Sequence, residues 1–155
     1  MHDMGVTASA AGRATVERGP GVLARLAASL FGFPEAADDV PVKVRFDVSN
    51  GIETWTRTFG TKSFSSRQSA GKGRSDGLLC EHFGPLTFAV ALVLEDGQLS
   101  LVLRRWSAFG MPLPLWLGPR STSYEVADEG RFRFHVDISH PFTGLIVRYR
   151  GWLAR

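Results

Sequence analysis

One predicted strand carries charged and aromatic side chains on the same face, and these residues are the most suited to chemistry. Glu53, Trp55 and Arg57 recur at every second position, so they share one face of the strand. If that face points inward, Arg57 needs a carboxylate partner, because an unpaired buried charge is costly. Glu81 is the expected partner. The pair would be either a structural ion pair or a charged floor that orients a ligand carboxylate or carbonyl.

Three other side chains join this group as candidates for ligand binding. Trp106 follows two arginines at the end of a predicted strand, and Trp116 lies in an apolar segment interrupted by prolines. Arg148 shares a strand face with Arg150 and Trp152. No motif assigns a catalytic residue. The full candidate set is Trp55, Arg57, Glu81, Trp106, Trp116 and Arg148.

Metal and cofactor chemistry has little support in the sequence. The four histidines show none of the HxH, HxxxH or HExxH spacings that hold zinc. The single cysteine, Cys80, excludes an internal disulfide and a multi-cysteine metal site. No nucleophile elbow and no phosphate-cradling loop followed by a helix occurs. We therefore expect neither a metal nor a cofactor.

The composition predicts one folded domain over residues 1–155 and argues against several partner classes. Apolar residues make up 44% and charged residues 21%, as in ordinary globular proteins. The net charge of +3 comes mostly from arginines scattered singly between apolar residues, which favours paired arginines on a β surface over a nucleic-acid interface. No apolar run approaches the roughly 18 residues of a membrane span, and we see no secretion signal. These features predict no membrane span and a cytoplasmic location.

Hydrophobic alternation with a period of two predicts a mainly β protein. The clearest run is residues 131–138, where four apolar residues alternate with four polar ones. Asn-Gly at 50–51 and Asp-Gly at 96–97 predict tight hairpin turns. We predict an antiparallel meander of about nine strands. It would curl into a barrel or clamshell, similar in general form to calycins, because closure removes exposed sheet edges.

Three segments differ from this pattern. Residues 1–10 are expected to be frayed. The segment from Met111 to Leu117 is apolar but rich in proline, so it cannot be a central strand, and we expect it to border a cavity mouth. One short helix is predicted at about residues 21–31. The apolar face by which this helix should pack is formed by Val22, Leu23, Leu26, Ala27 and Leu30.

Seven short motifs between residues 16 and 153 are informative in combination. They are VERG at 16–19, FGFP at 31–34, ETWTRTFG at 53–60, EHFGPL at 81–86, GMPLP at 110–114, GRFRF at 130–134 and YRGWL at 149–153. In these motifs the chain resembles a bacterial family that is labelled domain of unknown function 4166 (DUF4166). The resemblance implies a globular domain of undetermined activity, with no catalytic residues to carry over. It also implies association with an NAD(P)-binding oxidoreductase domain, whose Rossmann pattern does not occur in this sequence.

Three functions remain open at this point. The first is a binding module that holds a small hydrophobic or amphipathic ligand inside the barrel. The second is a small barrel enzyme of the cyclase or isomerase type, with Glu81 as the acid or base. The third is protein interaction or homodimer formation through the strip from Met111 to Leu117. A solid interior would remove the first, and a Glu81 held tightly by an arginine would weaken the second.

Overall fold

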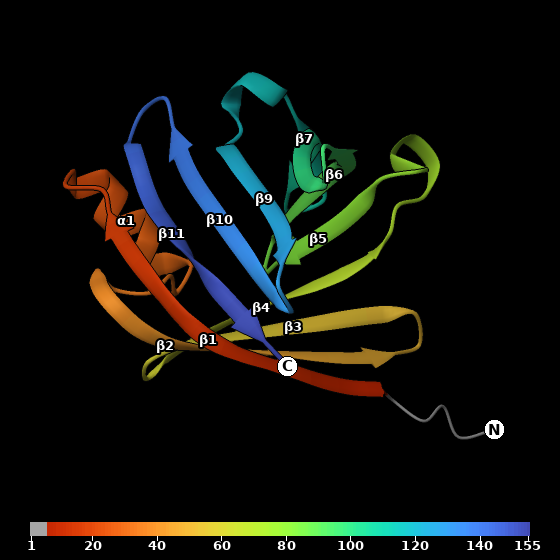
Figure 1. Cartoon of the computed structure of the whole chain (residues 1–155). Helices are drawn as coiled ribbons and strands as arrows, with labels where there is room; N and C mark the ends of the chain where they lie inside the picture. The colour runs from red at the N-terminus through yellow and green to blue at the C-terminus, as the bar shows by residue number, and fades with distance from the viewer. Residues whose placement is uncertain (1–5) are drawn as a thin grey trace.

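Ten antiparallel strands close into a barrel in the computed structural model, which describes residues 6–155 (Figure 1). An eleventh strand, β8, pairs only with β7 and lies outside the ring. One α-helix, α1 (Val22–Leu30), follows the first strand. The strands are β1 (Val6–Arg18), β2 (Ala37–Ser49), β3 (Ile52–Phe59), β4 (Lys62–Ala70), β5 (Leu79–Phe83), β6 (Leu86–Glu95), β7 (Gln98–Ala108), β8 (Met111–Leu113), β9 (Arg120–Asp128), β10 (Arg131–His140) and β11 (Gly144–Ala154).

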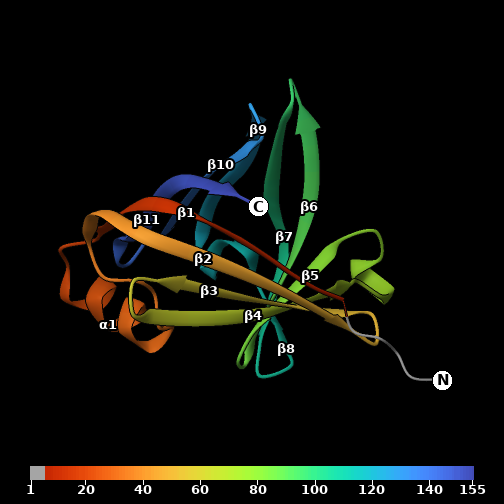
Figure 2. The ribbon, with the colours of Figure 1, turned by 60° about the horizontal axis from the view of Figure 1, so that its bottom comes forward.

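Strands that follow each other in sequence are neighbours almost everywhere in the barrel. The order runs from β6 back to β1, then through β11, β10 and β9 to β7, and pairing between β6 and β7 completes the ring. The predicted meander and its closure are therefore confirmed. The predicted hairpin turns are also present, since Asn50, Gly51, Asp96 and Gly97 all have positive φ angles. The hairpin of β6 and β7 projects beyond the other strands (Figure 2).

The first strand is longer than the sequence suggests. Residues 6–10, expected to be frayed, belong to β1 and pair with β2 from Val48 to Val44, while residues 1–5 lie outside the described part of the chain. Local alternation is weak there because the segment consists largely of small residues. Pairing of residues 6–10 with β2 supplies the order that the local sequence lacks, and β11 pairs with β1 only from Ala11 onward.

Helix α1 packs mainly by residues other than those predicted. Ala24 and Ala28 are fully buried, whereas Leu23 and Leu30 are 57% and 83% exposed. The small alanines allow the helix to lie close to β11, and Gly19 permits the same approach because a Cβ there would collide with the Leu145 carbonyl. Of the expected packing face, Ala27 contacts the core, whereas the larger side chains Val22, Leu23, Leu26 and Leu30 are exposed.

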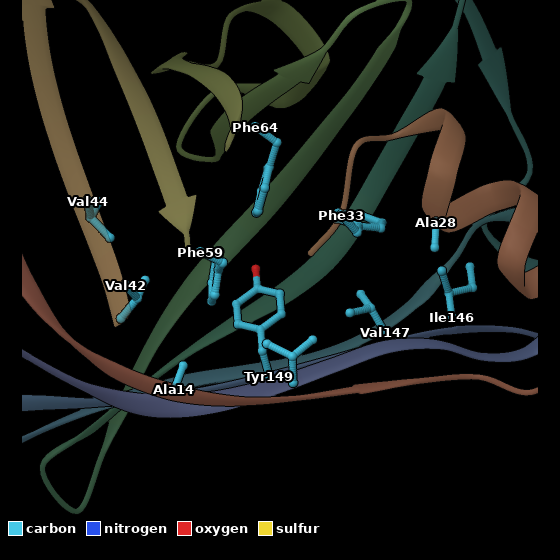
Figure 3. Packing of buried hydrophobic residues seen from close by; sticks show 11 residues of the cluster. Ala14, Ala28, Phe33, Val42, Val44, Phe59, Phe64, Ile146, Val147 and Tyr149 are labelled. Atoms are coloured by element: carbon cyan, nitrogen blue, oxygen red, sulfur yellow. The ribbon is translucent and has the colours of Figure 1, made fainter. Parts of the chain in front are cut away.

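The well-packed core lies beside α1 rather than along the whole barrel axis. It joins side chains of β1, β2, β3, β4 and β11 with Ala28 and Phe33 (Figure 3). Phe33 meets Phe64 edge-on at 5.6 Å, and Phe59 meets Tyr149 at 5.2 Å between ring centroids. The remaining strands, β5 to β10, contribute few buried residues. The core thus fills the part of the interior next to α1, and open space remains beside it.

The segment from Met111 to Leu117 covers a gap between two barrel strands. β7 and β9 pair only from Gln98 to Leu101, and the far part of β7 pairs instead with the short β8. A 3-10 turn, η2 (Leu115–Leu117), follows. The Trp106 indole donates a 2.8 Å hydrogen bond to the Pro114 carbonyl, and His140 Nε2 donates one of 2.8 Å to the Leu117 carbonyl. As predicted, the segment is not a central strand.

The two ends of the barrel differ in polarity. The segments with α1, with β8 and η2, and the turns at 60–61, 84–85, 109–110 and 141–143 connect the strands of the ring at one end, which we call the helix end. Most of the large apolar side chains that are exposed in the described structure belong to these segments. They are Val22, Leu23, Leu26, Leu30, Phe109, Met111, Leu115, Trp116 and Phe142. Within residues 6–155, no helix is both long and apolar enough to cross a membrane.

Candidate ligand-binding cavity

The barrel encloses a cavity of about 770 Å³. Its wall is mainly aromatic and aliphatic, and all ten strands of the ring except β1 contribute to it. Three of the four apolar residues that alternate along β10, Phe134, Val136 and Ile138, line the cavity, whereas Phe132 is 45% exposed. A volume of this size lies within the range of small-molecule sites, about 300–1,000 Å³. The interior is therefore hollow enough for a ligand.

A ladder of polar residues crosses three neighbouring strands on the cavity wall. Arg57 lies on β3, Ser66 and Gln68 on β4, and Glu81 on β5, where Gln68 is paired directly with Glu81. Glu81 Oε1 accepts hydrogen bonds from the Ser66 hydroxyl at 2.6 Å, from Arg57 Nη2 at 3.4 Å and from Gln68 Nε2 at 3.4 Å. Arg57 Nη1 also donates to Ser66 at 3.0 Å. The alternation of each strand brings these groups to one place.

The Arg57 guanidinium lies between two aromatic rings. Its central carbon is 5.2 Å from the Trp55 ring centroid and 5.4 Å from that of Phe64. The side chains of Arg57 and Glu81 are only 15% and 14% exposed. Pairing, hydrogen bonds and cation–π contact together offset the cost of removing these charges from water. The predicted pair of Arg57 with Glu81 is therefore present, and it is part of the wall.

Two further polar groups face this ladder, and the sequence argument did not single them out. Tyr149 of β11 is 7% exposed, and its hydroxyl points into the interior (Figure 3). Burial raises its pKa to about 12, although Arg57 opposes the rise. Glu125 of β9 also lines the cavity, where burial raises the pKa of its carboxyl and Arg57 partly lowers it. Neither the Tyr149 hydroxyl nor the Glu125 carboxylate has a hydrogen-bond partner in residues 6–155.

Glu125 gives a misleading signal in the sequence. Three inward side chains of β9, Ser121, Ser123 and Glu125, are polar. Alternation alone would assign such a row of polar residues to the solvent side of the strand. Only the pairing of Glu125 with Leu99 and Phe134, which both line the cavity, shows that this row faces inward. Ser66 and Gln68 are also polar, yet they are almost fully buried, because the pairing of β4 with β3 and β5 turns their face inward.

The structure brings together four of the six candidate residues. Trp55, Arg57, Glu81 and Trp106 all line the cavity, and Trp106 stacks on Phe88 with centroids 6.3 Å apart. The indole nitrogen of Trp55 is buried and has no hydrogen-bond acceptor within the described structure. Two candidates lie elsewhere, as described next.

Trp116 and Arg148 are not part of the cavity wall. Trp116 is 72% exposed and borders a second hollow along β7, η2 and β9. Arg148 alternates with the inward Tyr149 on β11, so it points outward. Its guanidinium pairs with Asp137 at 2.7 Å and with Glu17 at 3.2 Å, and these carboxylates raise its pKa. We therefore do not include either residue in the candidate site.

The chemistry available in the cavity is polar binding rather than an evident catalytic constellation. Glu81, the candidate acid or base, is held by Arg57, Ser66 and Gln68. Within the described residues, no group of three or more His, Cys, Asp or Glu side chains is placed to hold a metal ion. The arrangement can fix the polar end of a ligand while the aromatic wall contacts its apolar part.

Comparison with known proteins gives a family but no described activity. A comparison with curated proteins finds no match. A solved structure described as "a putative thioesterase II from Thermobifida fusca YX" aligns with 94% of this chain and 77% of its own chain, at 8% identity. Its TM-score of 0.26 is too low to support an argument. The family model described as "Domain of unknown function (DUF4166)" matches residues 1–153, nearly the whole chain, and the protein therefore belongs to the DUF4166 family.

Proposed function

We propose that this protein binds a small hydrophobic or amphipathic molecule inside its barrel. The observation that carries the proposal is the cavity of about 770 Å³, which has a largely apolar wall and one polar region around Arg57. Small-molecule sites in proteins share this combination of apolar lining and a few placed polar groups. The contacts would come from Trp55, Phe88 and Trp106 on the apolar side, and from Arg57 with its partners on the other.

An enzymatic function of the same cavity has weaker support. General acid–base catalysis by Glu81 would require its carboxylate to be available to a substrate. One oxygen of that carboxylate already accepts three hydrogen bonds, and Arg57 provides a charge partner. These contacts favour a structural and orienting role for Glu81, so binding is the better supported function.

Filling the cavity is expected to abolish binding. Leu101 of β7 lines the cavity, and tryptophan at this position would occupy part of the space. We expect the Leu101→Trp variant to lose at least about tenfold in affinity for the uncharged fluorescent probe N-phenyl-1-naphthylamine. Val102, the next residue, lies outside this cavity wall, so Val102→Trp is the matched control and should bind the probe normally.

The measurement is fluorescence titration of the three proteins, combined with native mass spectrometry of small molecules that co-purify with the wild type. Equal probe binding by Leu101→Trp and the wild type would place the probe elsewhere and contradict the proposal. A circular dichroism spectrum of each variant shows whether the β structure is retained.

Association through the helix end is the second candidate function, and the concentration of exposed apolar side chains there favours it. Trp116 is 72% exposed, Leu30 83% and Phe142 72%. Large exposed apolar surfaces commonly mark interaction sites. If two copies pair through this end, light scattering with size-exclusion chromatography should show a dimer for the wild type and a monomer for Trp116→Ala. A monomer in both cases would remove this candidate.

A further inference from the structure

We infer that the cavity discriminates by charge, accepting ligands whose polar end is an uncharged hydroxyl or carbonyl or a cationic amine, and disfavouring carboxylates. This inference rests on the ligand-binding function proposed above and narrows the class of ligand. It follows from the balance of charges on the cavity wall, from the existing partners of its one strong cation, and from the unpartnered groups beside it.

Carboxylates outnumber strong cations on the wall. Among the described residues that line the cavity, Glu53, Glu81 and Glu125 carry carboxyl groups, and Arg57 is the one lysine or arginine. Glu53 and Arg57 both lie on the inward face of β3, four residues apart with Trp55 between them. By formal charge, with histidines counted as neutral, the wall is negative whether Glu125 is ionised or protonated, because Glu53 and Glu81 together outnumber Arg57.

Arg57 is already engaged by the protein. Its two terminal nitrogens donate to Ser66 and Glu81, and its flat face lies against Trp55 and Phe64. A ligand carboxylate that approached Arg57 would have to share it with Glu81. Because a buried negative charge without its own cation is costly, such a ligand would lose affinity relative to an uncharged one.

The unpartnered groups in the cavity suit an uncharged polar end. Tyr149 keeps its proton, since its pKa is about 12, and its hydroxyl can donate to a hydroxyl or carbonyl oxygen. Glu125 can accept a hydrogen bond when ionised and can also donate one when protonated. An ammonium group would pair with Glu125 or Glu53. A carboxylate would accept from Tyr149 but would face both glutamates.

Three competitors with the same apolar chain test this inference: 1-decanol, decylamine and decanoate. Each is titrated near neutral pH against N-phenyl-1-naphthylamine bound to the wild-type protein. We expect decanol and decylamine to displace the probe at concentrations about tenfold or more below that of decanoate. In the double variant Glu53→Gln and Glu125→Gln, decanoate should gain affinity, because glutamine retains the shape of glutamate but not its charge. The difference between the displacing concentrations of decanol and decanoate should therefore become smaller.

The outcomes separate this inference from the function on which it rests. Decanoate binding as tightly as decanol to the wild type would overturn the charge argument while leaving cavity binding intact. If the folded double variant kept the same difference in affinity between decanol and decanoate, the charge argument would also be overturned, since other residues would then decide the preference. Equal probe binding by Leu101→Trp and the wild type would overturn both proposals. The wild-type comparison decides the question even if the double variant does not fold.

Discussion

Arg57→Met is expected to lower the free energy of unfolding by about 3 kcal/mol, the low end for breaking a buried ion pair. Methionine has a similar length and can still lie against Trp55 and Phe64, so packing is largely retained. The variant leaves the Glu81 charge in a wall position that is only 14% exposed, with Ser66 and Gln68 as its remaining donors. Urea unfolding monitored by tryptophan fluorescence measures the loss.

The matched comparison removes the other charge of the pair. Glu81→Gln retains an oxygen that can accept from Ser66, while Arg57 keeps its contacts with the aromatic rings and stays near Glu125. We therefore expect a smaller loss for Glu81→Gln than for Arg57→Met. The double variant should be more stable than the sum of the two losses implies, because no unpaired Glu81 charge remains. A change below about 0.5 kcal/mol for Arg57→Met would show that cavity water already screens the pair.

Gly151→Val is expected to destabilise the seam between β1 and β11, by about 2 kcal/mol or more, as overpacking does. Gly151 of β11 pairs with Ala14 of β1 and with Phe134 of β10. A Cβ at this position would collide with the Arg13 carbonyl and lie 2.8 Å from the Ala14 Cα. These are backbone atoms, so relief requires β1 and β11 to move apart. Thermal unfolding followed by circular dichroism measures the effect.

Gly21→Ala is the control for this glycine substitution. Gly21 has an ordinary φ of −68°, and the nearest atom to a Cβ there is 3.6 Å away. Gly21 is the residue before α1, and its replacement by alanine should lower the free energy of unfolding by less than about 1 kcal/mol. If Gly151→Val were as mild as Gly21→Ala, the seam would have to be more adjustable than its close backbone contact implies.

Alternation and turn chemistry predict much of the fold. The hairpins at Asn50-Gly51 and Asp96-Gly97, the shared apolar face of β10 and the exclusion of Met111 to Leu117 from a central strand all follow from local rules. The cost of burying a charge predicts that an inward Arg57 needs a carboxylate, and the structure provides Glu81. The turns and the alternation depend on residues that are close together in sequence. The charge pair depends on the requirement that a buried Arg57 has a carboxylate partner.

The failures have a common cause in contacts between distant segments. The apolar face of α1 was expected to pack inward, yet Ala24 and Ala28 do so, because a close approach to β11 favours small side chains. Arg148 was grouped with the ligand-binding candidates. On β11 it is next to the inward Tyr149, so its side chain points outward, where it pairs with Asp137 and Glu17. Local periodicity identifies two faces of a strand or helix, and it does not say which face a distant partner will cover.

The amino-acid sequence by itself determined that strands would alternate, where they would turn, and that Arg57 would need a carboxylate. The tertiary structure alone decided that β6 meets β7 to close a ring, that polar Ser66, Gln68 and Glu125 face inward, and that the space between the strands stays hollow. The physical reason is that side-chain spacing is a property of one strand, whereas register, closure and the volume left inside depend on how all the strands pair together.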